Sequence, residues 1–191
     1  MGPPVEPEDD AVALQPPRLY ISAMTTLAGR QPWLSLRSLL VLLCALAVCF
    51  GAAQLGAAAT YPNLAPWYEG LAKPPFNPPN AAFPVAWSIL FALMAVSLWR
   101  IVILGEGTAR RRALIAFAVQ LAFNIGWSFA FFAARSPLLG LIEIGPLLAA
   151  IAWTIGRFRP IDGIAAALLY PYLAWVTFAA LLNASILVLN G

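Results

Sequence analysis

The residues best suited to chemistry here are amides and indoles that share the faces of apolar segments. Gln120, Asn124, Trp127 and Ser128 follow one another at i, i+4, i+7 and i+8, which places them on one stripe of a helix. Lipid offers polar amides no partner, so this stripe must face the interior of a bundle or a cavity. Two interpretations stay open: hydrogen bonds between helices, or the polar wall of a ligand pocket.

Aromatic side chains extend this pattern to two further segments. Trp87 and Phe91 are four residues apart, and Trp175, Ala179 and Asn183 share a face near the C-terminus. Each aromatic residue alone is typical of core packing. Together with the amides, they favour a pocket for a flat, largely apolar ligand with a few polar edges.

Other chemistries lack their parts. The chain has no histidine, which excludes a Ser-His-Asp triad and a His-ligated haem, and most zinc sites with them. No nucleophile–base pair is evident, so we expect no metal site, no required cofactor and no firmly assigned catalytic residue. Glu143 is the only acid inside an apolar segment; interfacial placement, protonation and pairing with an amide are all open to it.

A stripe of small residues occupies nearly the opposite side of the segment that carries the amides. Ala118, Ala122, Gly126 and Ala130 recur every four residues, a spacing that lets two helix backbones approach closely. The stripe predicts either a homodimer interface or close packing within one subunit.

Composition identifies the elements that position these residues. The chain is 62% hydrophobic and 10% charged, against about 25% charged in soluble domains. Stretches nearly free of charge are long enough for helices of roughly 20 residues that cross a bilayer. They predict an all-α membrane protein, a bundle of five transmembrane helices near residues 39–59, 83–104, 113–134, 138–156 and 163–188. Pro171 predicts a kink in the last of them.

The connections differ in length and charge. The long one, 60–82 between helices 1 and 2, is rich in proline and aromatic residues and favours a lid over the bundle mouth, with an interfacial aromatic belt as the alternative.

Basic residues collect before the first helix and in 105–112 and 157–162. By the positive-inside rule the N-terminus is expected to be cytoplasmic, with loop 60–82 and the C-terminus outside. Residues 1–35 are expected to form a disordered extension to a domain at 36–191, with a start at Met24 as an alternative.

Several separated motifs resemble one known family. "WY" at 67–68, "KPPFNPP", "FPVAW", "QLAFNIGWSFAFF" and "YPYLAWVTFAALLN" occur in the order found in the TspO/MBR family of tryptophan-rich sensory proteins and translocator proteins, also called peripheral benzodiazepine receptors. The resemblance covers about residues 37–190.

The resemblance implies a five-helix bundle, often a homodimer, that binds porphyrins such as protoporphyrin IX. It implies a sensor or receptor linked to tetrapyrrole regulation or stress. The alternatives are a light-dependent porphyrin-degrading enzyme, in which Trp87 and Trp175 are the catalytic candidates, and a porphyrin or sterol transporter. Together with the helix faces, it implies ligand-binding positions at Tyr68, Pro78, Trp87, Phe91, Asn124, Trp127, Ser128, Trp175 and Ala179.

The chain also departs from the family pattern. Phe76 and Ala81 stand where many members carry tryptophan, so the loop holds fewer aromatic ligand contacts. The C-terminal sterol motif is absent because no basic residue follows Arg159, and we expect little dependence on sterols.

Overall fold

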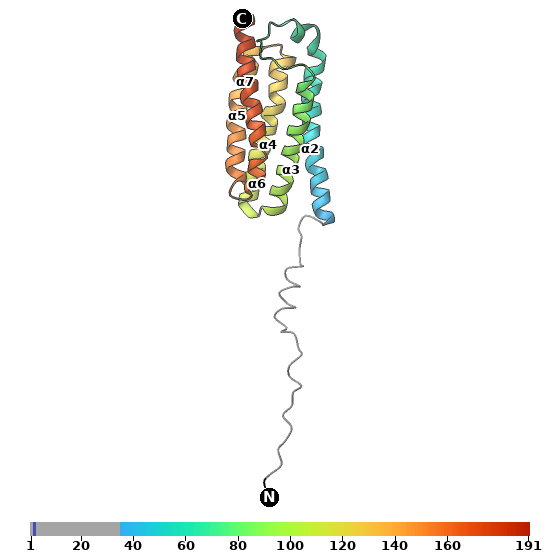
Figure 1. The fold of residues 1–191 in the computed structure, drawn as a ribbon, viewed down its shortest axis with the longest axis vertical. Helices are drawn as coiled ribbons and strands as arrows, with labels where there is room; N and C mark the ends of the chain where they lie inside the picture. Colours follow the sequence, from blue (N-terminus) through green and yellow to red (C-terminus); the bar gives the residue numbers. More distant parts are fainter. Residues whose placement is uncertain (1, 3–34) are drawn as a thin grey trace. The chain divides into compact units, whose positions relative to one another are not determined.

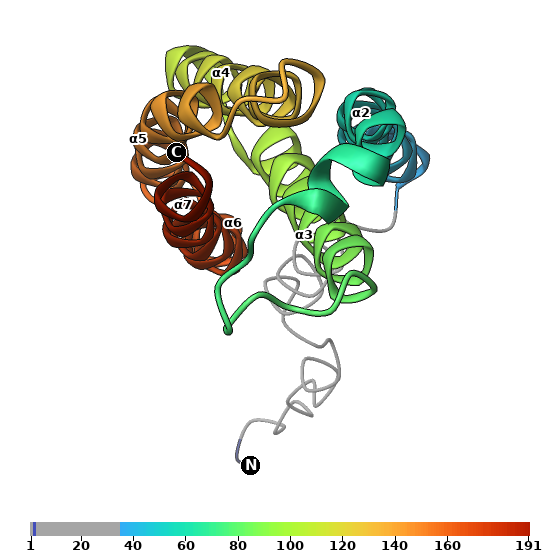
Figure 2. The same cartoon turned by 90° about the horizontal axis from the view of Figure 1, so that it is seen from above.

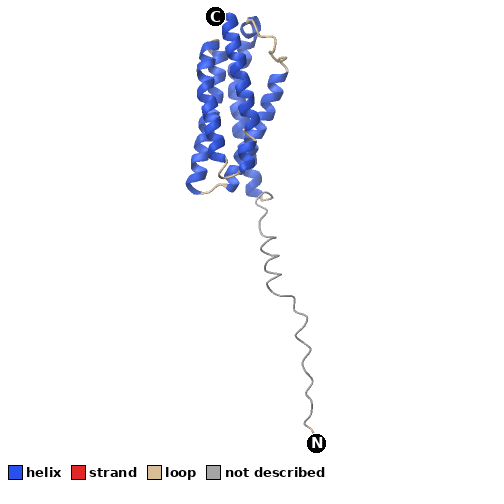
Figure 3. Cartoon of the chain, turned by 60° about the vertical axis from the view of Figure 1, so that its left-hand side comes forward, coloured by secondary structure: helices blue, strands red, loops and turns tan. Residues whose placement is uncertain are grey.

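A computed structural model describes Gly2 and residues 35–191. The predicted disordered extension at 1–35 lies outside the described residues except at Gly2 and Ser35, and it stays a prediction. The helical unit, Leu36–Gly191, contains five helices long and apolar enough to cross a membrane, which confirms the predicted fold class (Figures 1 and 3). The elements are α2 (Leu36–Thr60), η3 (Tyr61–Asn63), η4 (Leu64–Tyr68), α3 (Ala82–Leu104), α4 (Gly107–Ser128), η5 (Phe129–Ala133), α5 (Pro137–Phe158), α6 (Gly163–Ala167) and α7 (Tyr170–Asn190).

The long connection is shorter than the sequence predicted, because helical turns continue past Thr60. Pro62 stands in the first turn of η3, where proline costs no hydrogen bond. The side chains of Thr60 and Asn63 donate to carbonyls one turn earlier, at Gly56 (2.9 Å) and Ala59 (3.0 Å). The irregular loop is therefore residues 69–81.

The sequence predicts a kink at Pro171, and the structure interrupts the last span just before that residue. Helix α6 ends at Ala167, and α7 begins at Tyr170 with Pro171 in its first turn. Because proline has no backbone N–H to donate, a new helix starts there more readily than an old one continues.

The helices form a ring in which α3, α2, α4, α5 and α7 follow one another, as seen from above in Figure 2. The ring closes differently at its two ends. At the end away from the loop, α6 packs against both α3 and α5. Towards the loop, α3 and α7 lie apart, and the loop crosses this end of the bundle (Figure 2).

The end that contains α6, which we call the closed end, is held by polar contacts as well as by a dense core. Buried Ser97 Oγ donates to the carbonyl of Ala165 (2.7 Å). Arg100 forms an ion pair with Asp162, whose carboxylate also accepts from the first backbone N–H groups of α6. The hydrogen bond from Arg100 lowers the pKa of Asp162, which lies in the connection between two membrane spans.

Candidate functional site

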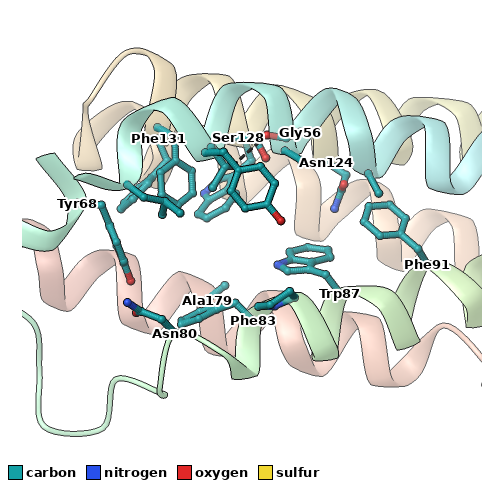
Figure 4. A pocket seen from close by; sticks show the side chains of 18 of the residues that line it. Gly56, Tyr68, Asn80, Phe83, Trp87, Phe91, Asn124, Ser128, Phe131 and Ala179 are labelled. Carbon is teal, nitrogen blue, oxygen red and sulfur yellow. Dashed lines mark hydrogen bonds between the residues drawn. The ribbon is translucent and has the colours of Figure 1, made fainter. Parts of the chain in front are cut away.

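A cavity of about 420 Å³ occupies the loop end of the bundle. Its walls come from α2, η4, α3, α4, η5 and α7, so segments distant in the sequence meet around one hollow. Figure 4 shows Tyr68 at one end of it and Phe91 at the other, with Trp87 between them. The volume falls within the range of small-molecule sites, roughly 300–1,000 Å³.

Aromatic rings make up much of the wall. Trp87 lies 5.6 Å from Phe91 and 6.3 Å from Tyr172, measured between ring centroids. On the other side, Trp127 stacks on Phe131 at 5.3 Å with only 19° between the ring planes. These contacts fix ring orientations, so the cavity offers flat surfaces to a flat ligand.

Neutral polar groups interrupt the aromatic wall. Asn124 Nδ2 donates to the hydroxyl of Tyr172 (3.0 Å), which is fully buried beneath the cavity. Asn183, with its amide oriented so that both groups are satisfied, donates to the carbonyl of Pro137 (3.0 Å) and accepts from the N–H of Leu141 (2.7 Å). Both amides are therefore held by the protein, and their placement does not depend on a ligand.

Close helix packing brings the polar wall together. A Cβ added at Gly56 of α2 would stand 3.0 Å from Ser128 Oγ of α4, so glycine allows the two helices to approach at this point. Figure 4 shows Ser128 and Gly56 on neighbouring helices at the same level of the cavity. The sequence pattern of α4 alone does not reveal this contribution of α2.

The cavity carries little charge. Among the described residues that line it, Glu69 is the one charged side chain, and it is exposed at the loop end. Trp127 Nε1 is buried and has no hydrogen-bond partner among the described residues. A ligand enclosed here therefore meets neutral donors and acceptors and no counter-charge.

Hydrogen bonds fasten the loop over this end of the bundle. Asn190, the last residue of α7, accepts from the backbone N–H of Ala72 and donates to its carbonyl, both at 2.9 Å. Lys73 Nζ donates to the carbonyls of Tyr68 (2.6 Å), Glu69 (3.2 Å) and Leu71 (3.2 Å) and lies 4.6 Å from the centroid of the Tyr68 ring. These contacts give the predicted lid a defined resting position.

The structure brings together eight of the nine residues predicted to bind a ligand. The cavity is lined by Tyr68, Trp87, Phe91, Asn124, Trp127, Ser128, Trp175 and Ala179. Pro78 instead borders a separate, open groove between α3 and α7. Gln120, although in the same stripe as Asn124, lies in the core with 1% exposure and its amide nitrogen 4.0 Å from Met94 Sδ. Whether these residues bind a ligand stays a prediction.

Sequence reasoning missed several lining residues. Phe83, Phe131 and Asn80 border the cavity, as do Gln54 and Thr60 of the first span. Gln54 was detectable, because it is the one amide in an otherwise apolar segment. Phe83, Phe131 and Thr60 were not, since a helical sequence pattern does not show which way the helix is rotated, and Asn80 lies in the irregular loop.

The small-residue stripe of α4 divides between two environments. Ala118 and Ala122 are exposed on the outside of the bundle, and Ala130 is partly buried. Gly126 packs inside the subunit, where a Cβ would stand 2.8 Å from Glu143 Oε1 of α5. A homodimer interface along this stripe stays a prediction, and Gly126 has a role within its own chain.

Glu143 lies between α4 and α5, beside the helix that carries the cavity wall. Its Oε2 atom is buried and has no hydrogen-bond partner among the described residues. No described group of histidine, cysteine and acidic residues is arranged to hold a metal ion.

The fold and cavity define a class: an integral, multi-pass membrane protein with a small-molecule cavity at one end of a five-helix bundle. Residues 43–189 match the TspO/MBR family, and the chain belongs to that family. It is 39% identical to the tryptophan-rich protein TspO of Chlorobaculum tepidum over 158 residues, which cover 81% of this chain and 98% of that protein.

Two further relatives show how widely the family extends. The tryptophan-rich sensory protein of Cereibacter sphaeroides is 38% identical over 65% of this chain and 77% of its own length. The translocator protein of Ovis aries is 36% identical over 61% of this chain and 70% of its own length.

Proposed function

We propose that this protein is a membrane receptor that binds a porphyrin, such as protoporphyrin IX, in the cavity at the loop end. The observation that carries the proposal is the cavity itself, whose fixed aromatic faces suit a flat macrocycle. The held amides of Asn124 and Asn183 supply neutral polar edges. Binding would inform the cell of tetrapyrrole levels or stress, as the family resemblance implies.

The charge of the wall sets the orientation of such a ligand. An ionised carboxylate buried without a counter-charge is costly, and the described lining offers no cation. The acid groups of a porphyrin would therefore stay at the loop end, with the apolar edge of the macrocycle inside against Trp87 and Phe91.

The experiment is a titration of the purified protein with protoporphyrin IX in darkness, followed by illumination. Quenching of tryptophan fluorescence that saturates, without later loss of porphyrin absorbance, supports a receptor. Absence of saturable quenching at micromolar porphyrin overturns the proposal.

The same experiment tests a second function, light-dependent porphyrin degradation with dioxygen as oxidant. Trp87 and Trp175 both line the cavity, which places two electron-rich indoles beside the proposed ligand. Bleaching that disappears in Trp87→Phe or Trp175→Phe would make the protein an enzyme. Transport of a porphyrin or sterol has less support, since the sequence shows no internal repeats and the described residues contain no pair of broken helices like those of alternating-access carriers.

The receptor is proposed to be a homodimer through the exposed part of the α4 stripe. Ala122→Leu tests this interface better than a substitution at Gly126 would. Ala122 is exposed, whereas a side chain at Gly126 would collide with Glu143 of the same subunit. We expect Ala122→Leu to convert the dimer to a monomer in detergent, measured by light scattering. An unchanged mass would exclude this interface.

The proposed orientation places the closed end in the cytoplasm. Arg37, Arg110–Arg112 and Arg157 stand at helix ends on that side, whereas Lys73 and Arg135 stand at the loop end. A membrane-impermeant maleimide should label Asn80→Cys from outside intact cells and leave Thr108→Cys, at an exposed position of the closed end, unlabelled. The reverse pattern would contradict the orientation.

A further inference from the structure

A second hollow lies on the outside of the bundle, on the seam between α3 and α7. It is an open groove of about 510 Å³, and all the described residues that line it are apolar. Ala86 and Ile89 of α3 form one side, and Pro171, Ala174 and Phe178 of α7 form the other. Ile89, Pro171 and Ala174 are exposed, so the groove opens to the surroundings of the bundle.

The seam opens towards the loop end because α3 is held to the last span at the closed end, through α6. At the closed end α6 packs against α3, and the contacts of Ser97 with Ala165 and of Arg100 with Asp162 hold it there. Towards the loop end the backbones of α3 and α7 lie apart (Figure 2), and aromatic rings such as those of Phe83 and Trp175 bridge them. The groove lies where α3 and α7 have separated.

Trp175 forms the wall between this groove and the inner cavity. It lines both hollows, and its ring meets that of Phe83 at 6.0 Å between centroids with 72° between the planes. Phe83 in turn lines the inner cavity. Trp175 is therefore the side chain shared by the two hollows, and the Phe83 ring packs against it on the side of the inner cavity.

The depth of the groove identifies what surrounds it. Trp175 precedes Asn190, at the end of α7, by 15 residues, or about 22 Å at 1.5 Å per residue. The hydrocarbon core of a bilayer is about 30 Å thick, so the groove opens to lipid tails and not to water. An apolar groove at this depth is accessible to acyl chains.

We infer that the seam between α3 and α7 is a lateral portal through which an apolar, membrane-dissolved ligand reaches the cavity directly from the bilayer. This inference rests on the proposed function, because it supplies the access route to the same cavity. Rotation of the Trp175 and Phe83 side chains connects the two hollows, while the loop stays fastened at Asn190.

The test narrows the groove without changing the cavity. Ala174→Phe adds a ring at an exposed position that lines the groove and does not line the inner cavity. The matched control is Ala152→Phe, which adds the same ring at an exposed position of α5. Binding and release of protoporphyrin IX would be followed in lipid nanodiscs by quenching of native tryptophan.

We expect Ala174→Phe to slow binding and release alike, by about tenfold, with an unchanged dissociation constant, and Ala152→Phe to behave as wild type. Ala86→Phe, on the opposite side of the groove, should reproduce the effect if Ala174→Phe folds poorly. Unchanged rates in the groove variants, together with faster rates in Asn190→Ala, would show that ligand passes the loop and would overturn the portal. No binding to wild type would instead overturn the proposed function.

A second measurement needs no porphyrin. Phospholipids brominated at mid-chain quench indoles that contact lipid tails. In nanodiscs of these lipids, wild type should therefore lose a larger fraction of its tryptophan fluorescence than Trp175→Phe. Equal or greater fractional quenching in Trp175→Phe would show that acyl chains reach Trp175 no better than the average tryptophan of the chain, and would contradict an open groove.

Discussion

The two ends of the bundle differ in how tightly α3 is held to the last span. At the closed end, an ion pair from Arg100 of α3 to Asp162 and a buried hydrogen bond from Ser97 to Ala165 hold α3 to α6. At the loop end, α3 and α7 diverge, aromatic rings fill the gap incompletely, and a cavity remains. We therefore assign stability to the closed end, and the proposed function assigns ligand binding to the loop end.

This division has a physical basis in the kinds of contact at each end. The ion pair and helix cap at Asp162 connect three segments with directional bonds. The loop end depends on ring contacts and on exposed hydrogen bonds of the loop, which are individually weak and can rearrange. Four predictions test the comparison, from the largest effect to the smallest.

Asp162→Asn should lower the free energy of unfolding by about 2 kcal/mol, because it removes a charge-assisted hydrogen bond at a mostly buried position. Thermal unfolding in detergent measures the change. Glu106→Gln is the control, since that exposed residue at the same end caps nothing with its side chain. Porphyrin affinity should stay within twofold; a large loss of affinity would show that the two ends are not separate.

The contribution of the Asp162–Arg100 ion pair should also appear in the pH dependence of the thermal stability. The pKa of Asp162 is lowered in the folded protein by its hydrogen bond from Arg100, so its contribution is complete above the ordinary aspartate pKa of about 3.9. The contribution is lost as pH falls through the lowered native value. Wild type should therefore lose more thermal stability than Asp162→Asn between pH 5 and roughly pH 3. Parallel curves for the two proteins would contradict this assignment.

Asn190→Ala should loosen the loop without destabilising the bundle. It removes both hydrogen bonds to Ala72, and we expect the Ala72 amide to exchange with deuterium about tenfold faster, consistent with about 1.4 kcal/mol of lost local protection. Hydrogen exchange read by mass spectrometry measures this. Ser185→Ala is the control on the same helix, since its hydroxyl bonds only within α7. Equal exchange in both variants would mean that the loop is fastened elsewhere.

Glu69→Gln should have the smallest effect, a roughly twofold tighter binding of protoporphyrin IX at low salt that fades as salt is added. Glu69 is exposed at the end of the cavity where the ligand's acid groups are proposed to lie. The dimethyl ester of the same porphyrin carries no acid charge and should bind both proteins equally. A change for the ester as large as for the acid would contradict the proposed orientation.

The sequence predicted the spans well because the physics of the bilayer acts on each segment separately. Gaps between charges delimit α3 and α5 to within a few residues, and Pro171 marks the break before α7. The aromatic and amide faces likewise pointed to Trp87 and Asn124, which the fold does place around one cavity.

What the sequence could not predict depends on how helices are arranged around one another. Gln120 shares a stripe with Asn124, but α3 covers it, so it lies in the core beside Met94. Gly126 belongs to the small-residue stripe, but α5 places Glu143 against it. The groove at Pro78 exists because α3 and α7 diverge, which no single segment encodes.

The central claim is that the cavity at the loop end holds the ligand, and one measurement tests it most directly. Wild type and Trp87→Ala would be titrated in parallel with protoporphyrin IX, in darkness and in nanodiscs. Loss of the aromatic surface that half-buried Trp87 offers to the ligand, worth about 1.5–3 kcal/mol, predicts that Trp87→Ala binds at least tenfold more weakly. Trp153→Ala, which removes an exposed indole of α5 outside the cavity, should bind as wild type does. Equal affinities for wild type and Trp87→Ala would place the ligand elsewhere and contradict the account.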